Sequence, residues 1–152
     1  MIKENTSLKG HYKFTLKDIN TGEEQVFEYD NIIPTSGRTL IANNLTDATP
    51  NNPILLNKAA LGTGTNTPAN ADTTLQTETY RNDLASRTNA ANIAYATAFF
   101  NATETTGTYR EAGIFADGAA GADTGILFSR VAINITKTNT QTLTLDWVLT
   151  LS

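Results

Sequence analysis

The segment from Leu61 to Arg81, LGTGTNTPANADTTLQTETYR, combines two closely spaced glycines with many hydroxyl side chains. Such a loop binds phosphate when a lysine follows the glycines and a helix begins there, because the lysine and the backbone amides then surround the anion. No lysine follows Gly62 and Gly64, and Pro68 interrupts the segment. A dinucleotide fingerprint would need a third spaced glycine in a βαβ unit. We therefore interpret Gly62 and Gly64 as positions of unusual backbone angle or close backbone approach, and expect no nucleotide cofactor.

A Ser–His–Asp site would have to use His11, the one histidine of the chain. This histidine lies in an alternating segment beside Tyr12, and the chain has no G-x-S-x-G sequence. Cysteine is absent, which excludes disulfides, thiolate nucleophiles and metal sites built on sulfur. We expect His11 to be an ordinary strand or surface residue.

Carboxylates are the remaining candidates for chemistry. A glycosidase needs two of them about 5–9 Å apart, and the candidates are Glu78, Glu104, Glu111 and Asp117. Nothing in the sequence brings any two of them together. The segment DGAAGAD, with Asp117 and Asp123, lacks the dense alternating acids of a calcium loop, so we interpret it as a flexible turn.

Arg110 and Glu111 are neighbours in the segment YREAGIF, which we expect to be a strand. Successive side chains of a strand point to opposite faces, so one of these two charges faces a buried or interface side. A buried charge must be paired or hydrogen-bonded, which favours a structural ion pair over a ligand site. The candidate partners are Arg81, Arg87, Arg130 and Lys137.

The elements that position these residues are expected to be mostly strands. Within residues 1–34, HYKFTLKDI alternates apolar and polar residues, INTG is a turn, and EQVFEYDN returns as the second strand of a hairpin, with Val26 or Phe27 and Tyr29 as its apolar residues. A short helix is expected over about 35–47, because Leu40, Ile41 and Leu45 recur at helical spacing. Thr35 and Ser36 are its candidate caps.

Residues 54–152 are expected to form the main β region. The segments ILLNKAALGTG, ANIAYATAFF, TYREAGIFA, ILFSRVAINI and QTLTLDWVLTLS all have strand character, and the last alternates most regularly. Between the first two, ADTTL is a candidate helical turn capped by Asp72. We predict a single, mainly β domain over 1–152: an antiparallel β-sandwich or open barrel with one short helix.

Charge and hydropathy limit the partners. The formal net charge is −4 and only 17% of residues are charged, with no basic run. Such a chain is poorly suited to bind nucleic acid or an anionic membrane. No apolar run approaches the roughly 18 residues of a membrane span, and the first residues lack the apolar core of a secretory signal.

Three segments together, ALGTGTNTPANADTTLQTETYR, YREAGIF and ILFSRVAINITKTNTQTLTLDWVLTLS, resemble a family of small structural proteins from the virions of tailed bacteriophages. The match covers about residues 60–152. The family pattern falls on Leu61 to Thr65, Pro68, Asp72 to Leu75, Glu78, Arg81, Glu111, Gly113, Phe115, Phe128, Arg130, Lys137 and Trp147.

The resemblance implies a β-sandwich-like virion component that works by assembly, with no enzymatic activity, no cofactor and no metal. Its partners would be other virion proteins and copies of itself, in a tail, collar or fibre apparatus. Capsid decoration and binding of a host-receptor glycan are the alternatives. The positions expected to serve structure or assembly are Gly62, Gly64, Asp72, Glu78, Arg81, Arg110, Glu111, Gly113, Phe115, Arg130, Lys137 and Trp147.

Overall fold

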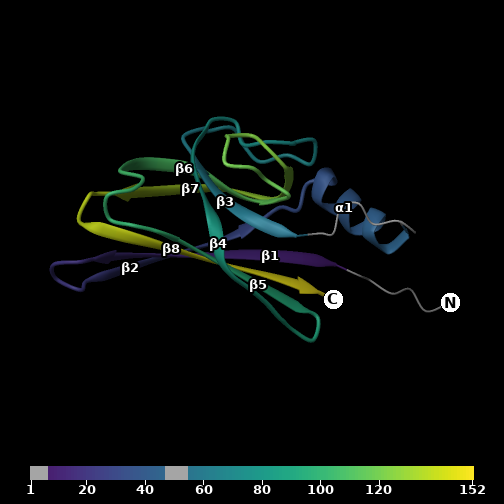
Figure 1. The fold of residues 1–152 in the computed structure, drawn as a ribbon, viewed down its shortest axis with the longest axis horizontal. Coiled ribbons are helices and arrows are strands. Elements are labelled where there is room, and N and C mark those ends of the chain that lie inside the picture. The colour runs from purple at the N-terminus through teal and green to yellow at the C-terminus, as the bar shows by residue number, and fades with distance from the viewer. Residues whose placement is uncertain (1–6, 47–54) are drawn as a thin grey trace.

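The computed structural model describes residues 7–46 and 55–152, which form eight strands and one helix (Figure 1). The elements are β1 (Leu8–Asp18), β2 (Glu24–Asn31), α1 (Thr35–Thr46), β3 (Leu56–Gly62), β4 (Glu78–Ala90), β5 (Ile93–Phe100), β6 (Gly107–Ala116), β7 (Ile126–Lys137) and β8 (Gln141–Leu151). The predicted fold class, mainly β and antiparallel with one short helix, is confirmed.

The strands form a nearly closed sheet in the order β2-β1-β8-β5-β4-β3-β6-β7. Its two ends meet at one point, where Ile32 and Arg130 exchange backbone hydrogen bonds of 3.1 and 3.2 Å. β1 pairs with β8 from Leu8 to Asp18, so the N-terminal hairpin belongs to the same sheet as the main β region. Both described chain ends lie together, because the backbone amide of Ser152 donates to the carbonyl of Ser7 (2.9 Å).

β4 is the strand at which the sheet turns from one layer to the other. Its first half pairs with β3 and its second half with β5, with an irregularity between Leu84 and Ser86. No strand was predicted from the sequence over these residues. Most of its second half is exposed on both faces, so the apolar alternation that identifies a half-buried strand is missing.

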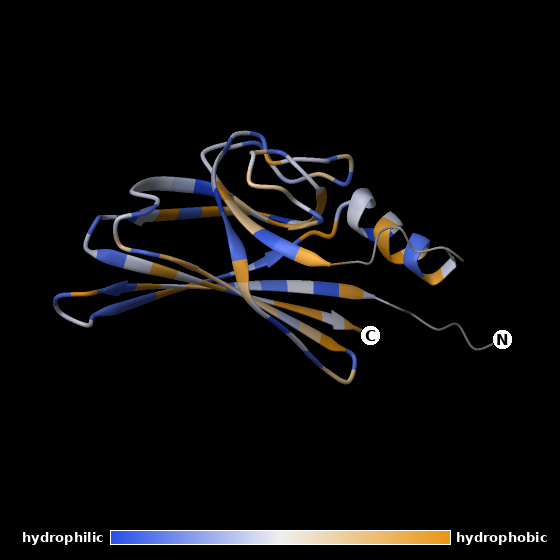
Figure 2. Ribbon diagram, viewed as in Figure 1, coloured by the Kyte–Doolittle hydropathy of each residue, from blue (hydrophilic) through white to orange (hydrophobic). Residues whose placement is uncertain are grey.

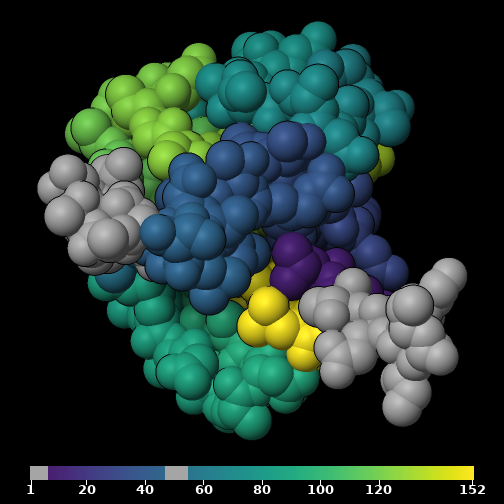
Figure 3. Space-filling view, turned by 90° about the vertical axis from the view of Figure 1, so that its right-hand side faces the viewer, coloured from purple at the N-terminus to yellow at the C-terminus, as the bar shows by residue number. Residues whose placement is uncertain are grey.

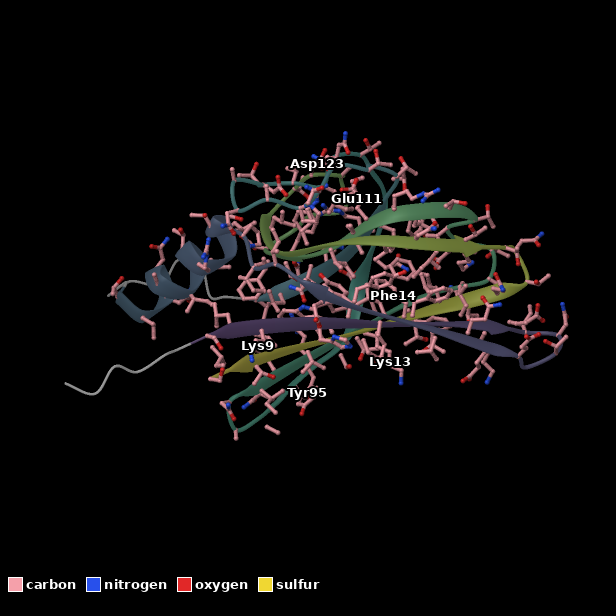
Figure 4. The ribbon with its side chains drawn as sticks, turned by 180° about the vertical axis from the view of Figure 1, so that it is seen from behind. Lys9, Lys13, Phe14, Tyr95, Glu111 and Asp123 are labelled. Carbon is pink, nitrogen blue, oxygen red and sulfur yellow. The ribbon has the colours of Figure 1, made fainter. Side chains whose placement is uncertain are left out.

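The core lies between the two layers, and apolar bands alternate with polar ones along the strands that enclose it (Figure 2). Phe14 of β1 is fully buried there (Figure 4). Trp147 of β8 is fully buried too and meets the Phe128 ring edge to face, with ring centroids 5.7 Å apart. The alternation noted in this segment places Leu143, Leu145, Trp147 and Leu149 on the buried face of β8, whereas Leu151 is 38% exposed.

The inward face of β5 carries small residues and Phe100, whereas two large aromatic residues lie on its outward face. Ala96, Ala98 and Phe100 are buried, while Tyr95 and Phe99 are exposed. Ala96 is the register partner of Trp147, and a short side chain beside the indole leaves room for it. In β2, Phe27 and Tyr29 pack against the core while Val26 is exposed.

Helix α1 agrees with the predicted range, but the hydroxyl of Ser36, one of its two candidate caps, bonds to β7 instead. The Ser36 hydroxyl donates to the Leu127 carbonyl of β7 (2.7 Å), and the Thr35 amide donates to the Asn70 carbonyl (2.9 Å). A Cβ on Gly37 would lie 2.5 Å from the Phe128 carbonyl oxygen. These contacts fasten the first turn of α1 to β7 and to the segment around Asn70.

Candidate functional site

Two long loops lie side by side at one end of the barrel, next to α1: loop 63–77 between β3 and β4, and loop 117–125 between β6 and β7 (Figure 3). Most of the residues singled out from the sequence lie in or directly beneath them. Figure 4 places Glu111 beneath the loops and Asp123 at their outer side.

Glu111 of β6 holds loop 63–77 in place. Its side chain is 1% exposed, and its Oε1 accepts hydrogen bonds from the backbone amides of Gly64 (3.0 Å) and Thr77 (2.7 Å). Its Oε2 accepts from the Gln76 amide (2.9 Å) and from Arg130 Nη2 (2.7 Å). One buried carboxylate therefore fixes both ends of the loop and neutralises a buried arginine.

Arg130 of β7 is the ion-pair partner of Glu111. The sequence alone left four basic residues as candidates for this partner. Its guanidinium is 1% exposed and contacts Glu111, the Asp72 carboxylate (2.5 Å) and the Asn66 side chain. The prediction that one charge of the Arg110–Glu111 pair is buried and paired is confirmed, since Glu111 is buried and Arg110 is exposed. Asn66 was missed, because only the folded loop brings it to Arg130.

Gly62 and Gly64 are required for space rather than for backbone angle, because neither has a positive φ. A Cβ on Gly62 would lie 2.5 Å from the Thr77 carbonyl oxygen. A Cβ on Gly64 would lie 2.5 Å from Glu111 Oε1. Both distances are closer than real Cβ contacts, so the glycines allow the loop to approach Glu111.

Asp72 does not cap a helical turn, and the helical turn expected in ADTTL is absent from the structure. Its Oδ2 instead accepts from the Ala69 amide (2.7 Å) and from Arg130 Nη1. The bond from the Asp72 carboxylate to the buried Arg130 guanidinium thus takes the place of the expected helix cap. Leu75, three residues on, is buried against Ala60, Phe115 and Leu127 and anchors the loop by apolar contact. Gly113 lies directly beneath Leu75, where a Cβ would be 3.0 Å from it.

Glu78 and Arg81 form a second ion pair that fastens loop 117–125. Their side chains are 1% and 3% exposed, and Arg81 Nε lies 2.5 Å from Glu78 Oε1. Arg81 Nη1 donates to the Ala119 and Thr124 carbonyls (3.1 and 3.0 Å), and Glu78 Oε2 accepts from the Asp123 amide (3.0 Å). The arginine also lies over the Phe115 ring, 4.7 Å from its centroid. The turn interpreted as flexible is therefore fastened at several points.

Lys137, at the end of β7, lies away from both loops. Its ammonium group is buried and donates to the Ala102 and Glu104 carbonyls (3.0 and 2.6 Å). Burial lowers the pKa of Lys137, with nearby Glu104 acting in the opposite direction. The lysine therefore supports the turn between β5 and β6. Trp147 is likewise a core residue and reaches neither loop.

Three of the four carboxylates considered for glycoside hydrolysis have side-chain contacts of their own. Glu78 binds Arg81 and Glu111 binds Arg130, while Glu104 accepts from the Asn101 amide (2.8 Å). That hydrogen bond lowers the pKa of Glu104, opposite to the shift that a general acid needs. Asp117 begins loop 117–125 in a left-handed conformation (φ 53°).

Within 7–46 and 55–152, no group of three or more His, Cys, Asp or Glu side chains could hold a metal ion. In the same ranges no helix has the length and apolar character needed to cross a membrane.

A cleft of about 590 Å³ lies between α1 and loop 63–77. Its walls carry hydroxyl and amide side chains from Thr35, Thr39, Asn43, Asn70 and Thr73. Leu40 and Ile126 add apolar surface to it. Asp72 also lines the cleft, with one carboxylate oxygen already occupied by Arg130. The cleft presents a mainly apolar surface, with hydroxyl and amide groups and Asp72 in its walls.

His11 lies on the outer face of β1, away from both loops. Its Nδ1 lies 2.8 Å from Asp30 Oδ1 and its Nε2 lies 3.3 Å from Glu28 Oε1, both on β2. The hydrogen bond to Asp30 raises the pKa of His11, partial burial opposes this, and Glu28 adds to the rise. The expected strand position of His11 agrees with the structure.

We expect an NMR titration of the single histidine to give a pKa above 6.5, and Asp30→Asn to lower it. Because the folded pKa is raised, the pair stabilises the fold fully below the unfolded pKa, and this contribution is lost as pH rises through the folded pKa. The sites are exposed, so it amounts to less than about 1 kcal/mol. Glu24→Gln, elsewhere on β2, is the control. A wild-type pKa at or below 6.5 would contradict the assignment.

Comparison of the chain with protein-family models, with curated proteins and with solved structures finds no match.

Proposed function

We propose that the chain is a structural protein of a tailed-bacteriophage virion. It would act through contacts with copies of itself and with other virion proteins in a tail, collar or fibre apparatus. Capsid decoration is the alternative location.

This proposal rests on what the buried charged residues bind in the segments that resemble phage virion proteins. Glu111 and Arg130 are buried and bonded to loop 63–77, and Glu78 and Arg81 are buried and bonded to loop 117–125. Their charges therefore serve to hold two loops in one conformation. A loop that is already ordered loses little conformational entropy on meeting a neighbouring subunit, which favours assembly.

The proposal is tested on gradient-purified particles of the phage that encodes the chain. Immunoblotting should detect the chain at many copies per particle, and immunogold labelling should place it at one repeated position. Particles of an unrelated phage, probed with the same antibody, serve as the control. Absence of the chain from purified particles, with abundant chain in the infected cell, would overturn the proposal.

Binding of a host glycan is the second candidate function, favoured by the cleft between α1 and loop 63–77. Its hydroxyl and amide side chains, together with Asp72, are groups that hydrogen-bond sugar hydroxyls. A glycan array with the purified protein should then give hits that Asn43→Ala removes. Hits unchanged in that variant would exclude this cleft.

A further inference from the structure

Among the residues that the structure describes, the second half of β4 has a strand partner on one side only. Within residues 7–46 and 55–152, the stretch Leu84–Ala90 pairs with β5 on one side, whereas β3 pairs only with the first half of β4, up to Asp83. Figure 1 shows the β4–β5 hairpin projecting beyond the rest of the barrel, with β3 well away from its tip. Unpaired main-chain groups along such an edge can accept another strand.

The direction of the free groups follows from the hairpin. Ala90 and Ile93 flank a two-residue turn, and the pair beside such a turn is hydrogen-bonded. The backbone groups of Ala90 and Thr88 therefore point to β5, and those of Arg87 and Asn89 point away from the barrel. Arg87 is the one charged residue between Leu84 and Ala90, and its Nη1 donates to the Leu56 carbonyl (2.5 Å).

Apolar surface lies on both sides of this edge. Leu55 is 49% exposed and Tyr95 is 38% exposed. Both line a hollow of about 260 Å³ together with Arg87, Thr88 and Asn89. Tyr95 projects from the outer face of β5 (Figure 4). A strand added along β4 would cover part of this surface as well as pair the backbone.

The outer edges of β2 and β7 are protected against strand addition. The outer face of β2 carries Glu24, Glu28 and Asp30, so pairing two copies of β2 would place like charges close together. The β7 edge is joined to Ile32, and the Tyr29 hydroxyl accepts from the Asn134 amide (3.3 Å). Within the described part of the chain, the second half of β4 has neither protection.

We propose that a second copy of this chain adds to the β4 edge, so that β4 of each copy pairs antiparallel with β4 of the other across a two-fold axis. An isologous contact needs a self-complementary strand. A register centred on Thr88 places Arg87 opposite Asn89 of the second copy and avoids opposing arginines. The Thr88 side chains of the two copies then meet at the two-fold axis. This pairing specifies one contact of the proposed assembly role. Where the paired strands would lie in a particle rests on that proposed function.

The experiment uses the full chain in solution. Sedimentation at protein concentrations of about 100 µM should show a dimer, and Asn89→Pro should raise its dissociation constant about tenfold or more. That substitution removes an outward N–H and leaves the pairing with β5 intact. Val26→Pro, on the outer edge of β2, is the matched control and should leave the dimer unchanged.

A second measurement uses the absence of cysteine. Opposed residues of a non-hydrogen-bonded antiparallel pair have Cα atoms about 4.5 Å apart, within the range of about 4.4–6.8 Å that a disulfide spans. Thr88→Cys should therefore form an intermolecular disulfide under mild oxidation much faster than Lys13→Cys, which lies on the outer face of β1 (Figure 4).

A monomeric wild type with no preference for the Thr88→Cys disulfide would overturn the proposal. A dimer that dissociates with Val26→Pro and persists with Asn89→Pro would also overturn it. Neither result bears on the virion assignment, which depends on finding the chain in particles. A β4-paired dimer absent from particles would leave the pairing intact and remove the virion role.

Discussion

Replacing Glu111 with glutamine should lower the free energy of unfolding by about 3–5 kcal/mol, the cost of removing one partner from a buried ion pair. Arg130 would lose its fully buried counter-ion. The amide has only one acceptor oxygen, whereas the carboxylate accepts from Gly64, Gln76, Thr77 and Arg130. The amide's NH₂ group would therefore face backbone donors that it cannot satisfy.

Urea unfolding followed by fluorescence measures this change, because Trp147 is the single tryptophan and is fully buried. Amide hydrogen exchange gives a local readout: the Gly64, Gln76 and Thr77 amides should exchange faster in the variant. Glu28→Gln is the control, since Glu28 is 60% exposed and its replacement should cost less than about 0.5 kcal/mol. A Glu111→Gln variant within about 1 kcal/mol of the wild type would contradict the role assigned to Glu111. Should that variant not fold, Asp72→Asn gives a milder test, because Asp72 is 18% exposed and Arg130 keeps Glu111.

The second large effect is expected for Gly64→Ala, which should destabilise the protein by about 1–3 kcal/mol, the usual cost of forcing extra atoms into a packed site. The new methyl group would lie 2.5 Å from Glu111 Oε1 and from Gln76 Cβ. Either the loop must move away from Glu111 or its hydrogen bonds must lengthen. The measurement is again the urea midpoint.

Gly121→Ala is the matched control for this prediction. A Cβ there would have its nearest neighbour at 3.8 Å, and Gly121 has no positive φ. Its replacement should be neutral or stabilise by up to about 1 kcal/mol, through reduced freedom of the unfolded chain. Equal destabilisation by the two substitutions would show that close approach to Glu111 is not the reason for Gly64.

Together these experiments separate two explanations of the Gly-Thr-Gly segment. In a phosphate-binding loop the backbone amides point at an anion from outside. Here the Gly64 and Thr77 amides are bonded to the chain's own carboxylate. Glu111 thus occupies the place that an external anion would take, which agrees with the interpretation of Gly62 and Gly64 as positions of close approach.

Alternation along the chain was enough to predict the strands that have one buried face. β1 and β8 alternate strictly because each has one face on the core, and that pattern is a local property of the sequence. The helix and the mainly β class follow from the same kind of local signal. Strand β4 was missed for the converse reason, because its second half has no buried face.

The sequence by itself also determined that one charge of the Arg110–Glu111 pair must be buried and neutralised, because neighbouring strand residues point to opposite faces. Only the tertiary structure decided that Glu111 is that residue and Arg130 its partner. The choice depends on the β6–β7 register, which sets Glu111 opposite Ala132 and Gly113 opposite Arg130. It depends equally on loop 63–77 folding back to bring Asp72 and Asn66 to the same guanidinium. Such long-range pairings leave no periodic trace in the sequence, because they depend on strand order and loop path rather than on neighbouring residues.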